Sequence, residues 1–359
     1  MINIISPINQ LGYGIAGINL LKALSKQTDV ALWPIGQPSV TNRADADAVS
    51  LAIQNSRMPD FSAPCVRVWH QHDMSQFVGK GLRVGFPIFE LDKFNELEVH
   101  HLSSLDKIFV CSNWAKNVVL SEVNIDKSDV HVIPLGVDTD TFKPAPPRED
   151  SKTIFFNCGK WEVRKGHDIL VQAFNNAFSE DDDVELWMMC ENPFYSETEQ
   201  LEWINLYKNS KLGDKVRIID RVESHEEVYN IMSEVDCGVF PSRGEGWNLE
   251  LLEMMACGKQ VIATSYAAHT EFCNDSNCLL VHPDGSELAY DGKWFHGKCG
   301  SWMKITAKQI DEISAMMQRV HRSKTLNHSG VLTAKKYNWN RSASTILTAL
   351  NLSQKAPNV

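Results

Sequence analysis

The feature of this sequence that most constrains its fold is a regular alternation of short apolar runs with segments of helical periodicity. Apolar runs of about four to eight residues are typical of strands buried on both faces. Helices that follow such strands in turn are typical of parallel sheets covered on both sides. The sequence therefore predicts the α/β class. We expect strands at 2–6, 29–35, 65–70, 82–89, 107–112 and 130–135, and again at 153–158, 184–190, 215–220, 236–241, 260–264 and 278–282.

The alternation breaks once, at Lys143-Pro-Ala-Pro-Pro-Arg148, which has the composition of a linker. A chain of 359 residues is also long for a single hydrophobic core. We therefore predict two doubly wound, Rossmann-like domains, at 1–145 and 151–335, with a last helix at about 338–359 folding back on the first. Ligands of such sheets bind at the carboxyl ends of the strands, so we expect a site in a cleft between the domains.

The composition disfavours several classes of protein and of partner without excluding an acidic polymer or a lipid surface. The formal net charge is −10, and no basic run of the kind that binds membranes or nucleic acid is present. No apolar run approaches the ~20 residues that span a bilayer, and no basic segment precedes the first strand, so we expect a cytoplasmic protein. The nine cysteines include no Cys-x-x-Cys pair, which favours reduced core residues over a disulfide frame or a zinc site.

The segment Val239–Gly258 carries the strongest chemical signal. A strand is expected to end at Pro241, a glycine turn to follow, and a helix to run from about Gly246 to Gly258. Unpaired backbone N–H groups at a helix start, together with the helix dipole, form a site for phosphate or sugar oxygens. Here those groups would belong to Gly246, Trp247, Asn248 and Leu249. Glu245 precedes the helix and Glu253 lies about two turns along it.

This segment resembles the signature of the retaining family-4 glycosyltransferases, in which two glutamates are separated by seven residues. The resemblance implies that Glu245 contacts hydroxyls of the donor sugar and Glu253 the ribose hydroxyls. Glu250 has no place in the pattern. The sequence departs from it with Trp247 in place of Phe and Lys259-Gln260 in place of a small residue and Pro. The matching residues are Ser242, Glu245, Gly246, Trp247, Leu252, Glu253, Met255, Ala256 and Gly258.

A second segment, Phe155–Gly166, places a glycine turn and cationic residues after another expected strand. In the resemblance, two cations here clamp the donor diphosphate, which implies that role for Lys160 and Lys165. Lys160 stands where Arg is usual, so a point charge replaces a bidentate fork. We interpret Arg164 as a charged residue exposed on this loop. Further along, Arg221 and Val222 resemble a loop whose backbone reads the nucleotide base.

The first half of the chain is less regular. Gly12 and Gly14 follow the first strand, where the resemblance places a glycine-rich loop near the donor phosphates. A nicotinamide site would need an acidic residue at the end of the second strand, and 31–36 supplies none. His72, with His70 as the alternate, follows the third strand, where the resemblance implies a histidine beside the transferred sugar. Glu90 ends the fourth strand and would meet the acceptor.

Two spacings could indicate a metal, and we interpret neither as a metal site. His70 and His72 lack an evident third ligand. Asp138 and Asp140 have the spacing that holds a divalent ion in a different glycosyltransferase fold, but they lie in a turn before the expected linker. We expect no metal and no cofactor, with lysines and a helix start stabilising the diphosphate instead.

The sequence therefore predicts a metal-independent glycosyltransferase in which His72, Glu245 and Lys165 carry the catalytic roles and a UDP-sugar is the expected donor. The acceptor stays open among a glycan, a lipid-linked sugar, a small metabolite and a modified DNA base. Two alternatives remain: a nucleotide-sugar epimerase or phosphorylase on the same fold, and a non-catalytic nucleotide-sugar binding module. Residues 283–303 follow no pattern that indicates a role.

Overall fold

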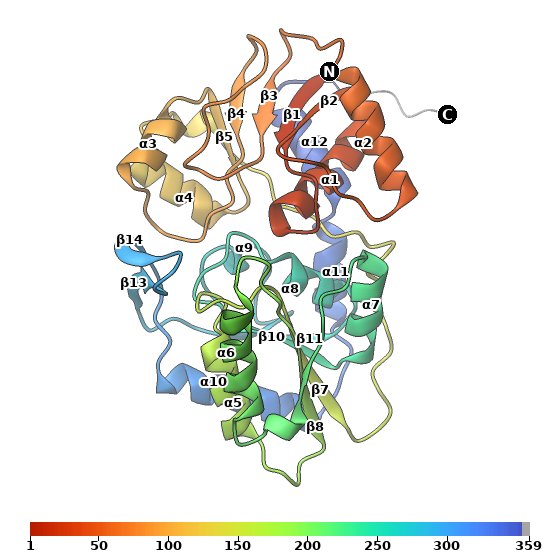
Figure 1. Ribbon diagram of the computed structural model, residues 1–359, viewed down its shortest axis with the longest axis vertical. Helices are drawn as coiled ribbons and strands as arrows, with labels where there is room; N and C mark the ends of the chain where they lie inside the picture. Colours follow the sequence, from red (N-terminus) through yellow and green to blue (C-terminus); the bar gives the residue numbers. More distant parts are fainter. Residues whose placement is uncertain (354–359) are drawn as a thin grey trace. The chain divides into compact units, whose positions relative to one another are not determined.

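A computed structural model describes residues 1–353, and the chain divides into two compact units (Figure 1). The first unit comprises Met1–Gly136 together with the segment that begins at Tyr337, and the second comprises Val137–Lys336. The division falls after Gly136, earlier than the expected linker at 143–150. That stretch belongs to the second unit, where the backbone N–H of Ala145 donates to the carbonyl of Cys257 at 3.1 Å.

The first unit is built on a parallel six-stranded sheet in the order β2-β1-β3-β4-β5-β6. All of its strands lie within expected ranges, but several are shorter. The fourth ends at Gly85, because Pro87 has no N–H to donate to a ladder. Its strands are β1 (Ile2–Ser6), β2 (Val30–Pro34), β3 (Cys65–Arg67), β4 (Arg83–Gly85), β5 (Lys107–Val110) and β6 (Val130–Val132), and its helices are α1 (Gly12–Ser25), α2 (Arg43–Asn55), α3 (Glu96–Ser103), α4 (Asn113–Glu122) and α12 (Trp339–Ala349).

The second unit has a parallel six-stranded sheet in the order β12-β11-β10-β7-β8-β9, with helices on both of its faces (Figure 1). The predicted α/β class with two doubly wound sheets is thus confirmed. The strands are β7 (Thr153–Cys158), β8 (Val184–Met189), β9 (Val216–Ile218), β10 (Cys237–Phe240), β11 (Gln260–Thr264) and β12 (Leu279–Val281), and the helices are α5 (His167–Ala177), α6 (Glu197–Lys208), α7 (His225–Glu234), α8 (Leu249–Ala256), α9 (His269–Phe272), α10 (Ala307–Arg322) and α11 (His328–Lys336).

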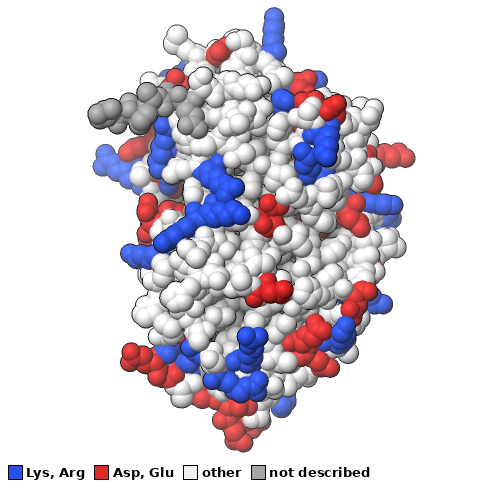
Figure 2. Space-filling view, turned by 180° about the vertical axis from the view of Figure 1, so that it is seen from behind, with Lys and Arg blue, Asp and Glu red and all other residues white. Residues whose placement is uncertain are grey.

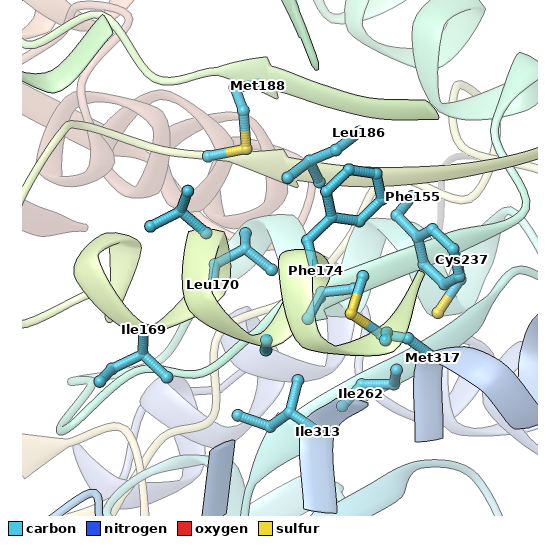
Figure 3. Close-up of a cluster of buried hydrophobic side chains, with 14 of the residues drawn as sticks. Phe155, Ile169, Leu170, Phe174, Leu186, Met188, Cys237, Ile262, Ile313 and Met317 are labelled. Atoms are coloured by element: carbon cyan, nitrogen blue, oxygen red, sulfur yellow. The ribbon is translucent and has the colours of Figure 1, made fainter. Parts of the chain in front are cut away.

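The core of the second unit lies between the sheet and the helices α5 and α10 (Figure 3). Leu170 and Phe174 of α5 point at the sheet, where they meet Phe155 of β7 and Leu186 of β8. All four side chains have no exposed surface. At roughly 1.5–3 kcal/mol for each fully buried large apolar side chain, this layer holds α5 and the loop before it against β7.

The last helix of the chain belongs to the first unit. A helix was expected at about 338–359, and α12 begins at Trp339, where Asn338 caps it by accepting a bond from the backbone N–H of Arg341. The preceding helix, α11, belongs to the second unit, whereas α12 packs on α1 of the first. Ser342 Oγ donates to the carbonyl of Pro134 at 2.6 Å, which fixes α12 to the first unit. The predicted final helix extended to 359, and its last six positions lie outside the described residues.

Residues 283–303, which follow no sequence pattern that indicates a role, contain an antiparallel hairpin of β13 (Ser286–Tyr290) and β14 (His296–Met303). The turn is closed by Asp291, whose carboxylate accepts from the backbone N–H groups of the three residues that follow Gly292. Figure 1 shows the hairpin at the edge of the second unit, apart from its parallel sheet.

The charged side chains form no extended basic surface on the face that Figure 2 shows. Apart from one short band, Lys and Arg lie among Asp and Glu there, as expected for a chain with a net charge of −10. Within residues 1–353 no helix has the length and apolarity needed to cross a membrane.

Candidate functional site

The order of the strands identifies where a ligand of the second unit should bind. Along this sheet the connection order reverses between β7 and β10, and ligands of doubly wound sheets bind at the carboxyl ends of strands at such a switch point. The loop 159–166 follows β7, and the loop 241–248 follows β10. These are the two segments that carry the chemical signals in the sequence, so the topology brings them together.

The loop after β7 has a backbone that requires glycine at both ends. Gly159 and Gly166 have φ values of 139° and 74°, which side chains disfavour. A Cβ at Gly166 would also lie 2.1 Å from the carbonyl oxygen of Pro241, so glycine allows the two loops to pack directly. Gly166 is the N-cap of α5 and places Lys165 immediately before that helix.

The carboxylate of Glu245 is the centre of the site. Its Oε1 accepts from Lys165 Nζ at 3.1 Å and from Ser242 Oγ at 2.9 Å, and its Oε2 accepts from Arg164 Nη1 at 2.8 Å. An ionised carboxylate offers about four lone-pair positions, so roughly one remains for a ligand. Glu245, Arg164 and Lys165 are all buried. The predicted contact of Glu245 with donor hydroxyls stays a prediction, and the structure limits it to about one further bond.

The charges in this group stabilise one another. Burial alone would raise the pKa of Glu245, but Arg164 and Lys165 outweigh burial and hold it well below its usual range. Burial likewise opposes the charge on Lys165, yet the adjacent Glu245 raises the pKa of that amine above its usual value. Both groups are therefore charged throughout the physiological range. A pair of this kind loses stability when either partner is removed.

Arg164 is a site residue that the sequence reasoning did not assign. Its Nε and Nη2 donate to Glu162 Oε2 at 3.1 and 2.7 Å, and its Nη1 also donates to the carbonyl of Gly244 at 2.8 Å. The interpretation of Arg164 as an exposed loop charge is wrong, because this fork joins the loop after β7 to the loop after β10. The signal available in the sequence was the nearby acidic residue Glu162, which gives a buried guanidinium a partner.

Lys160, the expected second cation of the clamp, lies at the margin of this group. Its ammonium is 3.2 Å from Glu162 Oε1 and 5.0 Å from the centre of the Phe194 ring, with 36% of its side chain exposed. Its contact with a diphosphate stays a prediction. Lys165 is closer to the centre of the site, with its ammonium bonded to Glu245 and packed against Gly159.

His167 is a second residue that the sequence reasoning missed. The backbone N–H of Glu162 donates to its Nδ1 at 3.0 Å, so the ring proton is on Nε2, which is 3.0 Å from Asn157 Oδ1. Burial, and then the charge of Lys165, lower the pKa of His167 to about 3, which keeps the ring neutral. Asn157 in turn donates to the carbonyl of Val239 at 2.6 Å. The imidazole thus fixes the loop to β7 and, through Asn157, to β10.

The helix after the second loop begins later than expected. It starts at Leu249, because Asn248 adopts φ 82° and its side chain accepts from the backbone N–H of Leu251. The prediction of a start at Gly246 is wrong, so the backbones of Gly246 and Trp247 belong to the turn. The side chain of Trp247 is buried, and its ring packs on Phe272 with centroids 4.9 Å apart.

Glu253 differs from Glu245 in having no charged or hydrogen-bonding partner among the described residues, although it is buried. Burial, followed by the negative charges of Glu250 and Asp138, raises the pKa of Glu253 to about 8. The isolated carboxyl group is costly to bury when ionised, and a ligand with hydroxyl donors would relieve that cost. This arrangement suits the predicted contact with vicinal hydroxyls, which stays a prediction.

The remaining residues of the second unit have simpler places. Asp138 Oδ1 accepts from the backbone N–H of Asp140 at 3.0 Å and its Oδ2 accepts from Thr141 Oγ1 at 3.0 Å, so this pair forms a turn as interpreted. Arg221 and Val222 lie between β9, which is an edge strand of the sheet, and α7. Their predicted contact with a nucleotide base stays a prediction.

In the first unit, the loops after β1, β3 and β4 meet around Tyr13. Its hydroxyl donates to the carbonyl of Ile88 at 2.8 Å and accepts from the N–H of the same residue at 3.0 Å. Its ring centre lies 4.7 Å from that of His70, which is stacked 5.2 Å from that of His72. Burial raises the pKa of Tyr13 well above its usual value, with a smaller contribution from the charge of Glu90.

The predicted residues of the first unit are therefore gathered around a tyrosine that the sequence reasoning passed over. Gly14 is needed for packing, since a Cβ there would lie 2.3 Å from Asn9 Oδ1, whereas a Cβ at Gly12 would meet nothing within 4 Å. His72 is exposed, and His70 and Glu90 are half-buried. Their assignments to donor, sugar and acceptor stay predictions.

Comparison with known proteins gives this arrangement a context. Residues 152–291 match the model of the family described as Glycosyl transferases group 1. A curated relative, the phosphatidylinositol N-acetylglucosaminyltransferase GPI3 subunit of Saccharomyces cerevisiae (strain YJM789), is 23% identical over 264 residues, covering 64% of this chain and 57% of that protein. The D-inositol 3-phosphate glycosyltransferase of Xylanimonas cellulosilytica is 28% identical over 225 residues, covering 56% of this chain and 52% of that protein. The chain thus spans little more than half the length of these relatives.

Two solved structures share the fold over nearly the whole chain. Sucrose-phosphate synthase from Thermosynechococcus elongatus has a TM-score of 0.70 at 17% identity, covering 97% of both chains. Anabaena Alr3699/HepE, solved in complex with UDP-glucose, has a TM-score of 0.70 at 13% identity, covering 98% of this chain and 99% of that one. The prediction of two doubly wound, Rossmann-like domains, the architecture known as GT-B, is confirmed.

Proposed function

We propose that this chain, which over residues 152–291 matches the group 1 glycosyl transferases, moves a sugar from a UDP-sugar to an acceptor hydroxyl with retention of anomeric configuration. The observation that carries the proposal is the buried group of Lys165, Arg164 and Glu245 at the switch point of the second sheet, with the unpaired Glu253 on the adjoining helix. A group of this composition offers positive charge to a diphosphate and a free carboxyl to a ribose.

The donor phosphates are assigned to Lys165 and the backbone of the loop before α8. A lysine ammonium has three donors, and Lys165 uses one of them on Glu245. The remaining two can bind phosphate oxygens while Glu245 keeps the ammonium in place. UDP and UDP-glucose are bound by Anabaena Alr3699/HepE, which shares the fold, and this supports a uridine diphosphate donor here.

The chemistry assigned to the site is stabilisation of a departing diphosphate. In a retaining transfer without a protein nucleophile, the acceptor hydroxyl attacks from the face that the diphosphate leaves, and a phosphate oxygen takes its proton. The residues then act by positioning the donor and by stabilising negative charge as it develops. With Lys165 and a helix start in that role, the reaction is proposed to need no metal and no cofactor.

The first unit is assigned the transferred sugar and the acceptor. His72, with His70 as the alternate, is placed at the sugar, and Glu90 at the acceptor. The half-buried carboxylate of Glu90 can accept a hydrogen bond from an attacking hydroxyl. Gly12 and Gly14, which follow β1, are assigned to the donor phosphates.

Product analysis tests this function. The protein is incubated with a panel of UDP-sugars and of glycan, lipid-linked, small-molecule and modified-DNA acceptors, with and without EDTA. We expect UDP and transferred sugar in equal amounts, unchanged by EDTA, and an anomeric configuration that matches the donor. An isomerised donor without UDP would indicate an epimerase, a sugar phosphate would indicate a phosphorylase, and binding without any product would indicate a binding module. Loss of activity in EDTA that manganese restores would contradict the metal independence.

A further inference from the structure

The hairpin β13–β14 is held rigidly although it lies outside the parallel sheet. A two-stranded hairpin is marginally stable by itself, so its anchors carry information about its role. The guanidinium of Arg243, which makes a bidentate pair with Asp168 at 2.8 Å, stacks 5.9 Å from the centre of the Trp302 ring. The backbone N–H of Met303 donates to the carbonyl of Arg243 at 2.8 Å. Arg243 thus ties the hairpin to the loop after β10, which carries Glu245.

The tip of the hairpin presents aromatic rings to solvent. Tyr290 and Trp294 are 64% and 46% exposed, and Phe194, from the loop after β8, is 51% exposed. The rings of Trp294 and Phe194 meet edge to face with centroids 6.1 Å apart. We call Phe194, Tyr290 and Trp294 the aromatic patch. It is unfavourable to expose large aromatic rings together to water, and exposed apolar patches of this kind mark binding sites.

The aromatic patch is continuous with the proposed donor site. The ammonium of Lys160 lies 5.0 Å from the centre of the Phe194 ring and 3.2 Å from Glu162, the carboxylate that also binds Arg164. On the other side, Lys293 next to Trp294 stacks 4.3 Å from the centre of the Tyr195 ring and pairs with Glu199. The tip of the hairpin is therefore fixed in position beside the loop after β7.

The charges around the aromatic patch favour a neutral ligand. Glu191 and Glu197 flank Phe194 in the sequence and are exposed, while Lys298 is the exposed cation of β14. The cations that lie over the rings are Lys160 and Lys293. Each is paired with a carboxylate, Glu162 and Glu199 respectively, so they do not form the cluster of unpaired cations that nucleic acid and anionic membranes require. Aromatic faces beside carboxylates suit a sugar, because its C–H face packs on a ring while its hydroxyls donate to carboxylate oxygens.

We propose that the aromatic patch is a binding subsite for pyranose rings of a glycan acceptor, distal to the hydroxyl that receives the transferred sugar. This inference rests on the proposed glycosyltransferase function, and it names the acceptor class as a glycan. The second unit then contributes to acceptor binding as well as to donor binding. Trp294 supplies the main stacking surface, and Phe194 orients it.

Isothermal titration calorimetry with maltohexaose, cellohexaose, chitohexaose and a mannohexaose tests the subsite, with UDP as the probe for the donor site. We expect one of the hexasaccharides to bind, and Trp294→Ala and Phe194→Ala each to weaken that binding tenfold or more while UDP affinity changes less than twofold. Phe61→Ala is the matched control, since Phe61 is 58% exposed on the first unit and should leave both affinities unchanged.

Several outcomes would overturn the subsite without touching the proposed function. The first is that the protein binds UDP but none of the hexasaccharides. The second is that a hexasaccharide binds the wild type and Trp294→Ala equally well. The third is that phosphatidylglycerol vesicles or single-stranded DNA bind in a way that depends on Trp294. Loss of UDP binding by the wild-type protein would instead refute the donor site on which the proposed function rests. Circular dichroism of each variant confirms that it folds.

Discussion

The isolated carboxyl group of Glu253 makes nucleotide binding dependent on pH. Its pKa of about 8 in the free protein reflects burial and the charges of Glu250 and Asp138. If ribose hydroxyls donate to this group, the ligand binds the ionised form, and binding must release the proton that Glu253 carries. The test compares UDP-glucose affinity across pH, because the phosphates of UDP-glucose keep constant charge in this range.

The magnitude follows from the pKa. With a value of about 8, roughly nine-tenths of the Glu253 side chains are protonated at pH 7, so about 0.9 proton is released for each UDP-glucose bound. The affinity should then rise about ninefold between pH 6 and pH 7, and less than twofold between pH 8 and pH 9. The Glu253→Gln variant cannot ionise and should bind more weakly, with an affinity that does not change with pH.

Calorimetry at pH 7 in two buffers of different ionisation enthalpy measures the released proton directly, and a titration at each pH unit from 6 to 9 measures the slope. The Glu250→Gln variant keeps Glu253 able to ionise but removes one of the charges that raise its pKa, so its affinity should keep a pH dependence that is displaced to lower pH. A wild-type affinity that is flat between pH 6 and pH 8, or an equal slope in the Glu253→Gln variant, would refute the assignment of Glu253 to the ribose.

Three other predictions concern stability and the division of roles. Because the folded pKa of Glu253 exceeds the ordinary value of 4.5, the contribution of Glu253 to stability is greatest below pH 4.5 and is lost as pH rises through 8. Glu253→Gln should therefore be more stable than the wild type by about 3 kcal/mol at pH 7 in urea unfolding, and an equal stability would contradict the shift. Arg164→Ala removes one of the two cations paired with each of the buried carboxylates Glu162 and Glu245 and should cost about 3–5 kcal/mol, whereas a loss below 1 kcal/mol would show that the Arg164 pairs are unimportant. Glu90→Gln should raise the KM for the acceptor and His72→Ala should lower kcat, and both variants should keep the wild-type affinity for UDP. A large loss of UDP affinity in either variant would contradict the assignment of that residue to the sugar or the acceptor.

The sequence predicts the sheets well because their signal is local. Each strand of a buried parallel sheet is an apolar run bounded by turn residues, so β7 and β11 were expected at the residues where they occur. The boundary of α8 was missed, because Asn248 caps the helix from a left-handed conformation that the sequence signals only weakly. The hairpin was missed because its strands are stabilised by Arg243 and Asp291, which are contacts that periodicity does not reveal.

The sequence indicates only part of the candidate site, because a local motif can be recognised in it whereas a contact between distant residues cannot. Lys165 and Glu245 were found because each stands in a motif next to a glycine turn. Arg164 and His167 were not, because their importance comes from burial against partners on another loop and another strand. A charge or an imidazole beside a loop has no fixed meaning until its partners are known.

The most direct test of the central claim is the rate of sugar transfer in the Lys165→Ala variant, measured as UDP release with the donor and acceptor identified by product analysis. We expect a folded protein whose rate of sugar transfer is lowered by two orders of magnitude or more, because the ammonium of Lys165 is assigned to the departing diphosphate. Lys26→Ala, which removes an exposed lysine at the end of α1, should transfer at the wild-type rate. A folded Lys165→Ala protein that transfers sugar at the wild-type rate would contradict the assignment of Lys165 to the donor diphosphate.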